Sequence, residues 1–117
     1  MKDKNELIEQ LVEQYKYPIV IVDLNHEIKY LNQAAKLKYA KRGFNDLKNK
    51  SVFNCHNPLS VDRIKQYVEE LKNGLDEIYL TTTKENQKVF MVAIRDQNKE
   101  LVGYYERFED IHKTEHE

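Results

Sequence analysis

The spacing of the hydrophobic residues changes once in the second half of the chain, and this change limits the folds that the sequence can adopt. Between residues 60 and 74 the apolar positions recur three and four apart, at Val61, Ile64, Val68 and Leu71, and Gly74 follows them. That spacing predicts one long amphipathic helix that ends at the glycine. Beyond it, hydrophobic residues alternate with a period of two near residues 78–83, 88–95 and 101–108, which predicts three strands joined by short turns.

The first half of the chain is expected to add two helices and a strand pair. A helical apolar pattern covers residues 5–15, with Asp3 or Asn5 as its cap. Pro18 ends this pattern, and the runs at 19–22 and 27–31 then predict two strands around a turn. Asn32 is a suitable N-cap for the next helix. Asp23 and Asp96 each follow an apolar strand, where a carboxylate accepts backbone N–H bonds within a turn.

Size and composition exclude several classes of protein. A chain of 117 residues has the length of one domain, and a charged fraction of 33% indicates a heavily charged surface. The net charge of −1 gives no basic stripe for nucleic acid. No apolar run is long enough to span a membrane, and the first residues lack a signal peptide's apolar core. The single cysteine, Cys55, excludes an internal disulfide. We expect a cytoplasmic protein.

Several recognisable local motifs lie along residues 17–110. The passage from second strand to helix carries Ile28, Tyr30, Asn32 and Ala34, and the stretch VAIRDQNKELVGYYERFEDI has a glycine in its last strand and leads into D-I. These motifs resemble the first strand pair and the closing hairpin of the PAS sensory domain family. Before the long helix, Cys55, His56, Pro58 and Ser60 form the pattern C-H-x-P-x-S, which resembles a subgroup of bacterial and archaeal PAS domains. The resemblance implies an α+β fold, in which helices cover one face of a five-stranded antiparallel sheet and enclose a pocket.

The expected organisation is a flanking helix at 1–16, the PAS domain at 17–111 and a charged tail at 112–117. By that resemblance, the pocket lies between the sheet and the long helix. Its candidate lining residues are Cys55, His56, Ile64, Tyr67, Val68, Phe90, Val92 and Ile94. The sequence leaves open which face of each strand points into the pocket, because a shift of one residue exchanges the two faces.

The stretch FNCHNPLS, residues 53–60, has two interpretations. Thiolate and imidazole both ligate haem iron, so His56 or Cys55 could serve as an axial ligand. The simpler interpretation is a helix entrance, in which Ser60 caps the long helix and Cys55 packs as a small hydrophobic residue. The second is favoured, because the haem-binding PAS domains often carry a histidine within the long helix and residues 61–73 contain none. The sequence does not decide between haem, flavin and no cofactor.

Two functions compete. The first is a non-enzymatic sensory module that binds a small molecule and signals through its terminal helices. The second is a ligand-free module for homodimerisation or partner docking, and a haem-based gas or redox sensor is a narrower form of the first. The candidate dimer surface is the apolar stripe of the first helix, Leu7, Ile8, Leu11 and Val12. No nucleophile and base stand at a recognisable spacing, so no catalytic activity is expected.

Overall fold

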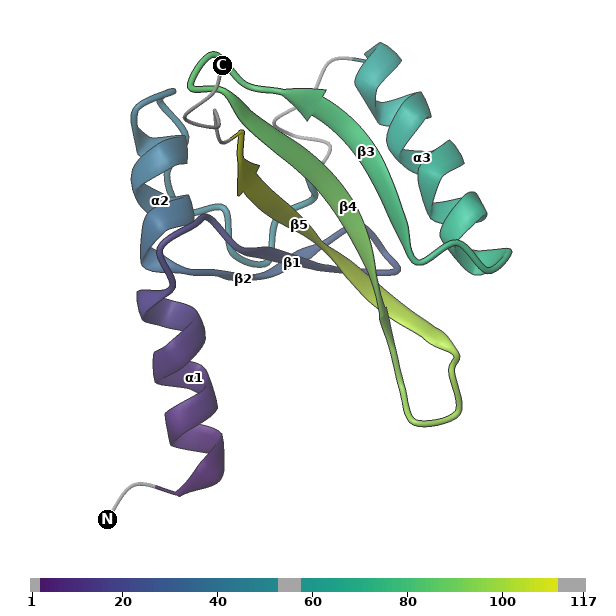
Figure 1. Cartoon of the computed structure of the whole chain (residues 1–117), viewed down its shortest axis with the longest axis horizontal. Helices are drawn as coiled ribbons and strands as arrows, with labels where there is room; N and C mark the ends of the chain where they lie inside the picture. Colours follow the sequence, from purple (N-terminus) through teal and green to yellow (C-terminus); the bar gives the residue numbers. More distant parts are fainter. Residues whose placement is uncertain (1–2, 53–57, 112–117) are drawn as a thin grey trace, which may run out of the picture.

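The computed structural model describes residues 3–52 and 58–111, which form one five-stranded antiparallel sheet with three helices. In chain order the elements are α1 (Lys4–Gln14), β1 (Val20–Asp23), β2 (Ile28–Leu31), α2 (Gln33–Ala40), α3 (Pro58–Lys72), β3 (Glu77–Thr82), β4 (Gln87–Arg95) and β5 (Leu101–Asp110). The strands lie side by side in the order β2-β1-β5-β4-β3 (Figure 1). The α+β fold expected from the sequence is confirmed.

Strand β5 lies at the centre of the sheet, between β1 and β4. Its Gly103 pairs with Asp23, and a Cβ atom built on this glycine would lie 2.6 Å from the carbonyl oxygen of Val22. Such a distance is far below a normal contact. The glycine that the sequence carries in its last strand therefore allows β1 and β5 to approach each other.

Asn32 is fully buried and joins α1, the segment that leads into β1, and α2. Its side-chain oxygen accepts hydrogen bonds from the backbone N–H of Ala35 at 3.0 Å, which caps α2 as predicted, and from that of Ile19 at 2.9 Å. Its side-chain nitrogen donates to the carbonyl oxygens of Val12 at 3.0 Å and Tyr17 at 2.9 Å. One amide thus holds the end of α1 against the start of α2.

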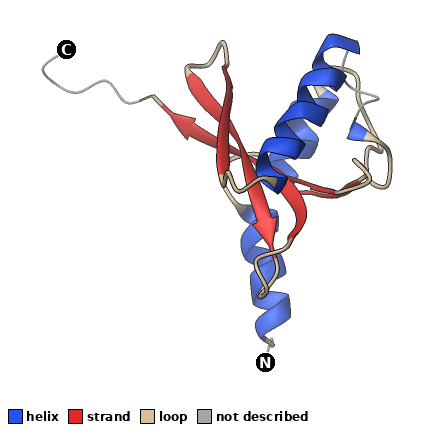
Figure 2. Cartoon of the chain, turned by 90° about the vertical axis from the view of Figure 1, so that its right-hand side faces the viewer, coloured by secondary structure: helices blue, strands red, loops and turns tan. Residues whose placement is uncertain are grey.

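Helix α3 lies over one face of the sheet (Figures 1 and 2). It begins at Pro58, so Ser60 lies in its first turn and the expectation that Ser60 is the N-cap was wrong. Proline suits the first helical position, since its fixed φ is helical and its missing N–H has no partner there anyway. The predicted end at Gly74 is confirmed by its φ of +116°. Arg95 of β4 then donates to the carbonyl oxygens of Leu71 and Leu75, at 2.7 and 3.0 Å.

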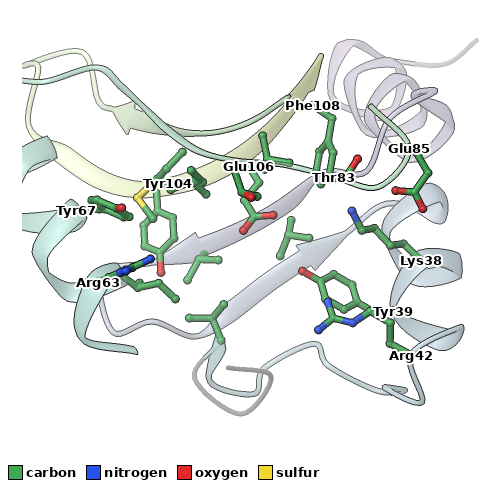
Figure 3. Close-up of a pocket in the computed structure, with 18 of the residues that line it drawn as sticks. Lys38, Tyr39, Arg42, Arg63, Tyr67, Thr83, Glu85, Tyr104, Glu106 and Phe108 are labelled. Atoms are coloured by element: carbon green, nitrogen blue, oxygen red, sulfur yellow. The ribbon is translucent and has the colours of Figure 1, made fainter. Parts of the chain in front are cut away.

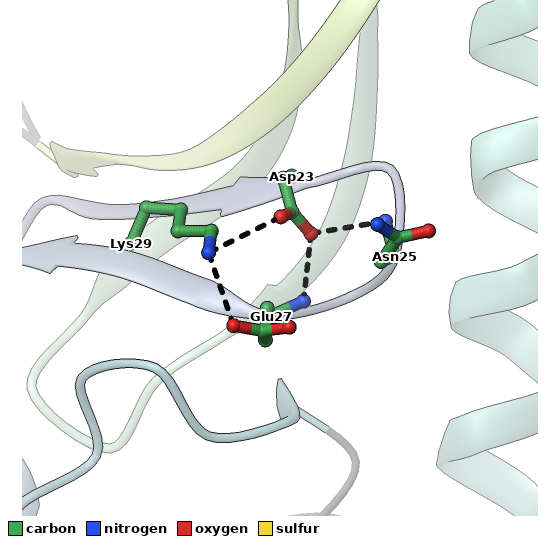
Figure 4. A network of polar contacts seen from close by, with 4 residues as sticks. All are labelled: Asp23, Asn25, Glu27 and Lys29. Carbon is green, nitrogen blue, oxygen red and sulfur yellow. Dashed lines mark hydrogen bonds and ion pairs between the residues drawn. The ribbon is translucent and has the colours of Figure 1, made fainter.

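Three hairpin turns have the same pattern of side-chain-to-backbone hydrogen bonds and the same backbone conformation. In the turn after β1, Asp23 Oδ1 accepts from the backbone N–H of Asn25 and Glu27, and its other oxygen lies 3.6 Å from Lys29 Nζ (Figure 4). Asp96 accepts in the same way from residues 98 and 100, so the predicted structural role of both aspartates is confirmed. In the third turn the hydroxyl of Thr83 takes the place of the carboxylate. The fourth residue of each turn has a positive φ: His26, Asn86 and Lys99.

The buried core lies between the sheet and the α2 and α3 helices. It includes Ile28 and Leu31 of β2, Ala35 of α2, Val68 and Leu71 of α3 and Met91 of β4. Helix α1 has no buried residue and extends away from the sheet (Figure 1). Within the described ranges, no helix is long and apolar enough to cross a membrane.

Candidate functional site

A cavity of about 710 Å³, which we call the central cavity, lies between the sheet and the helices α2 and α3 (Figure 3). Its described lining has an apolar part contributed mainly by the strands: Val20, Val22, Val52, Ile64, Leu80, Val89, Met91 and Phe108. Its polar lining residues are Lys38, Tyr39, Arg42, Arg63, Tyr67, Thr81, Thr83, Lys84, Glu85, Tyr104 and Glu106. Small-molecule sites combine apolar walls with polar groups that orient the ligand, and this lining contains both.

The packing of α3 explains where the cavity opens. The C-terminal half of the helix packs tightly on the sheet, because Leu71 and Val68 are buried in the core and Arg95 holds the last carbonyls. The middle of the helix contributes Ile64 and Tyr67 to the cavity instead. The cavity therefore lies beneath the second and third turns of α3 and extends towards α2.

Two oppositely charged side chains face the cavity from different walls: Lys38 of α2 and Glu106 of β5 (Figure 3). Both residues are half-buried. Burial raises the pKa of the Glu106 carboxyl, and the positive charges of Lys38 and Arg42 oppose that shift. Burial lowers the pKa of Lys38, and Glu106 opposes that change. Lys38 Nζ also lies 4.1 Å from the ring centre of Phe108.

The other end of the cavity carries phenol groups. Tyr67 of α3 and Tyr104 of β5 lie there with Arg63, at the opposite end from Lys38 and Arg42 (Figure 3). Tyr104 is 2% exposed and its hydroxyl lies 3.3 Å from Nδ1 of His26. Burial raises the pKa of Tyr104, so its hydroxyl stays protonated and can donate a hydrogen bond.

The structure brings some of the predicted pocket residues together and separates others. Ile64 and Tyr67 line the cavity, and Val68 lies next to them in the core. Phe90, Val92 and Ile94 are not among the lining residues, because β4 presents Val89 and Met91 to the cavity.

Phe90 lies on the opposite face of the sheet. There it contacts Tyr79, at 5.8 Å between ring centres, and Arg107, whose guanidinium carbon lies 4.3 Å from the ring centre. The residues on both faces of β4 are mostly apolar, so the hydrophobic pattern alone could not predict which face points into the cavity.

Cys55 and His56 fall outside the described residues, as does the tail at 112–117. Sequence reasoning missed Lys38, Arg42 and Glu106. Glu106 had a detectable signal, since it stands two residues from both Tyr104 and Phe108 and so shares their face of the strand. Lys38 and Arg42 had no such signal, because their place at the cavity depends on how α2 packs against the sheet.

The dimer-helix candidates lie on the exposed surface of α1. Leu7, Ile8 and Leu11 are 59, 49 and 65% exposed, and Val12 is half-buried. Tyr30 of β2 donates a hydrogen bond to the Glu13 carboxylate, which holds the other side of the helix against the domain. Three of the four residues of the apolar stripe, Leu7, Ile8 and Leu11, are thus left exposed to solvent in this chain.

Comparison with known proteins gives a family match and a set of similar structures. The family model described as "PAS domain" matches residues 8–112. The C-terminal domain of a Streptococcus mutans protein is 24% identical with a TM-score of 0.73, and the match covers 92% of this chain and 84% of that one. A PAS domain from Colwellia psychrerythraea is 19% identical with a TM-score of 0.69, covering 93% of this chain and 98% of that one.

A sensory box sensor histidine kinase from Vibrio cholerae is 15% identical with a TM-score of 0.61, and the match covers 92% of this chain and 91% of that chain. At these identities the solved structures show a shared fold. No curated protein matches the sequence of this chain.

Proposed function

The chain belongs to the PAS domain family of sensory domains, and from this premise we propose that it binds a small molecule in the central cavity and signals through α1. The observation that carries this proposal is the cavity itself. Its volume of about 710 Å³ falls within the range of about 300–1,000 Å³ that is typical of ligand pockets. A domain whose only task was to dimerise would need no such space.

The hydrogen bonds of Asn32 support a route from the cavity to α1. Helix α2 supplies Lys38 and Tyr39 to the cavity, and its first turn is capped by Asn32. The same side chain donates to the Val12 carbonyl of α1. A ligand that binds one position of α2 more tightly than another would therefore also shift the position of α1.

The output that we propose is a change in dimerisation through α1. Its exposed stripe of leucine and isoleucine is the kind of surface that an identical helix of a second copy can cover. An isolated helix of three turns is marginal in water. Packing against a second copy would stabilise it.

The exposed stripe also favours an alternative, a ligand-free interaction module. In that case the cavity would hold only water, and the domain would serve to join two copies or to dock a partner. Haem sensing is a narrower alternative. The described lining offers no imidazole or thiolate, and the candidate ligands Cys55 and His56 lie outside the described residues, so haem has no structural support here.

Native mass spectrometry of the freshly purified domain tests the proposal. The native mass gives the number of subunits, and its excess over the denatured mass reports any retained molecule. We expect a dimer that carries a small molecule in its cavity. A bare dimer that also shows no binding in a metabolite screen would favour the interaction module, and a mass excess equal to haem would favour the haem sensor.

A further inference from the structure

The two charged side chains that face each other in the central cavity, Lys38 and Glu106, attract each other but make no direct contact. Neither makes an ion pair or a side-chain hydrogen bond with another described residue, although each is half-buried. A charge that is partly removed from water destabilises a fold unless a partner compensates it. A molecule bound between these two side chains could supply the direct polar contacts that the fold does not.

The positions of the charges indicate the chemistry of that molecule. Lys38 lies in α2 and Arg42 follows the helix, four residues further on, and their positive charges act together on Glu106. An ammonium and a guanidinium on one wall favour a carboxylate, which can accept charge-assisted hydrogen bonds from both. Glu106, when ionised, only accepts hydrogen bonds, so the group next to that carboxylate should be a donor.

The remaining lining residues of the cavity indicate the chemical character of the rest of the ligand. Val22, Val89, Met91 and Leu80 form apolar walls beside the charged groups, and Phe108 presents its ring to Lys38. Such walls favour an aliphatic or aromatic body. A phosphate or nucleotide would leave these apolar walls unused.

We propose that the central cavity binds a small organic acid with a hydroxyl or amino group beside its carboxylate and an apolar body. The carboxylate binds Lys38 and Arg42, the hydroxyl or amino group donates to Glu106, and the body packs on the walls from β1, β3 and β4. This inference rests on the proposed sensory function and adds the ligand class to it.

Four probes with the same phenyl body test the inference by isothermal titration calorimetry: phenyllactate, phenylalanine, phenylpropanoate and phenylethylamine. The first two carry both required groups, the third lacks the donor and the fourth lacks the carboxylate. We expect phenyllactate or phenylalanine to bind at least about tenfold more tightly than phenylpropanoate, which corresponds to one hydrogen bond to a charged group. Phenylethylamine should not bind.

Two variants test the residues. Lys38→Met keeps most of the length of the side chain without its charge, and should weaken binding of the acids by about tenfold or more. Glu106→Gln should weaken the hydroxy and amino acids but not phenylpropanoate. Lys41→Met is the matched control, because Lys41 is exposed, follows α2 directly and does not line the cavity. Circular dichroism checks that all variants are folded.

The inference is overturned if no acid binds, if phenylethylamine binds as tightly as the acids, or if Lys38→Met and Lys41→Met behave alike. Native mass spectrometry separates this failure from a failure of the sensory proposal. A retained molecule that is not an organic acid would refute the ligand class and leave the sensor standing. An empty cavity together with no probe binding would count against both.

Discussion

Gly103 occupies a position where a side chain has no room. A Cβ atom at this position would lie 2.6 Å from the backbone oxygen of Val22, and a backbone atom of a paired strand cannot move away as a flexible side chain can. We expect Gly103→Ala to lower the free energy of unfolding by about 1–3 kcal/mol, the usual cost of overpacking. Urea unfolding followed by circular dichroism measures this change.

The adjacent Val102 is 46% exposed and provides the control. Val102→Ala should change the stability by less than about 0.5 kcal/mol, as surface substitutions usually do. If Gly103→Ala were as stable as Val102→Ala, the close approach of β1 and β5 at this glycine would be wrong.

The structural role of Asn32 requires its amide nitrogen, because this atom donates hydrogen bonds to two backbone carbonyls. Asn32→Asp has the same shape but places an acceptor oxygen against both carbonyl oxygens. The two carbonyls lose their donor and a buried charge is added, so we expect a loss of about 3 kcal/mol in unfolding free energy at neutral pH. Thermal unfolding measures it, with Asn45→Asp at an exposed position as the control. Equal melting temperatures for the two variants would contradict the assigned bonds.

At the scale of elements, the turns show which features a sequence can predict. Asp23, Asp96 and the Asn32 cap of α2 were predictable because each side chain bonds backbone groups within four residues of itself. The inner face of β4 was not, because its two alternating sets of residues are both apolar and only tertiary packing distinguishes them. The same holds for Lys38 and Glu106, which line one cavity only because α2 packs beside the sheet.

The turn between β4 and β5 contains a residue in a strained conformation. Lys99 has a φ of +65°, which costs about 1 kcal/mol for a residue with a Cβ and nothing for glycine. Its side chain is exposed, so little packing is lost on substitution. We expect Lys99→Gly to stabilise the domain by about 0.5–1 kcal/mol in urea unfolding. Asn98→Gly, one residue earlier and without a positive φ, should be destabilising instead, and a gain in both would refute this explanation.

Helix α1 is the element on which the proposed dimerisation depends. Leu11 is 65% exposed, so Leu11→Glu should leave the fold of one copy intact while placing a charge in the interface. We expect dimer affinity to fall about 30-fold or more, as for a central interface residue. Sedimentation velocity over a range of concentrations measures the affinity. Gln10→Glu adds the same charge beside the stripe and should leave the dimer unchanged; a monomeric wild type would refute the interface.

At the scale of the whole molecule, the central cavity should make the stability of the domain depend on pH. Burial raises the pKa of the Glu106 carboxyl in the folded protein above the value of about 4.3 in an unfolded chain. The folded state therefore holds this proton more tightly. The associated stability is fully present below the unfolded pKa and is lost as the pH rises through the folded pKa. Above the unfolded pKa, this carboxyl therefore lowers the stability of the fold, either because it takes up a proton on folding or because its ionised form is buried.

Glu106→Gln removes this cost, because the amide has the same shape and does not ionise. The variant should be more stable than the wild type in urea at about pH 8, and the difference should shrink as the pH falls to about 4. Glu109→Gln, at an exposed position of the same strand, should show no such trend. If Lys38 and Arg42 stabilised the carboxylate by more than its burial costs, the order at pH 8 would reverse. A cavity that retains a carboxyl at a cost in stability is more consistent with selection for a ligand than for stability.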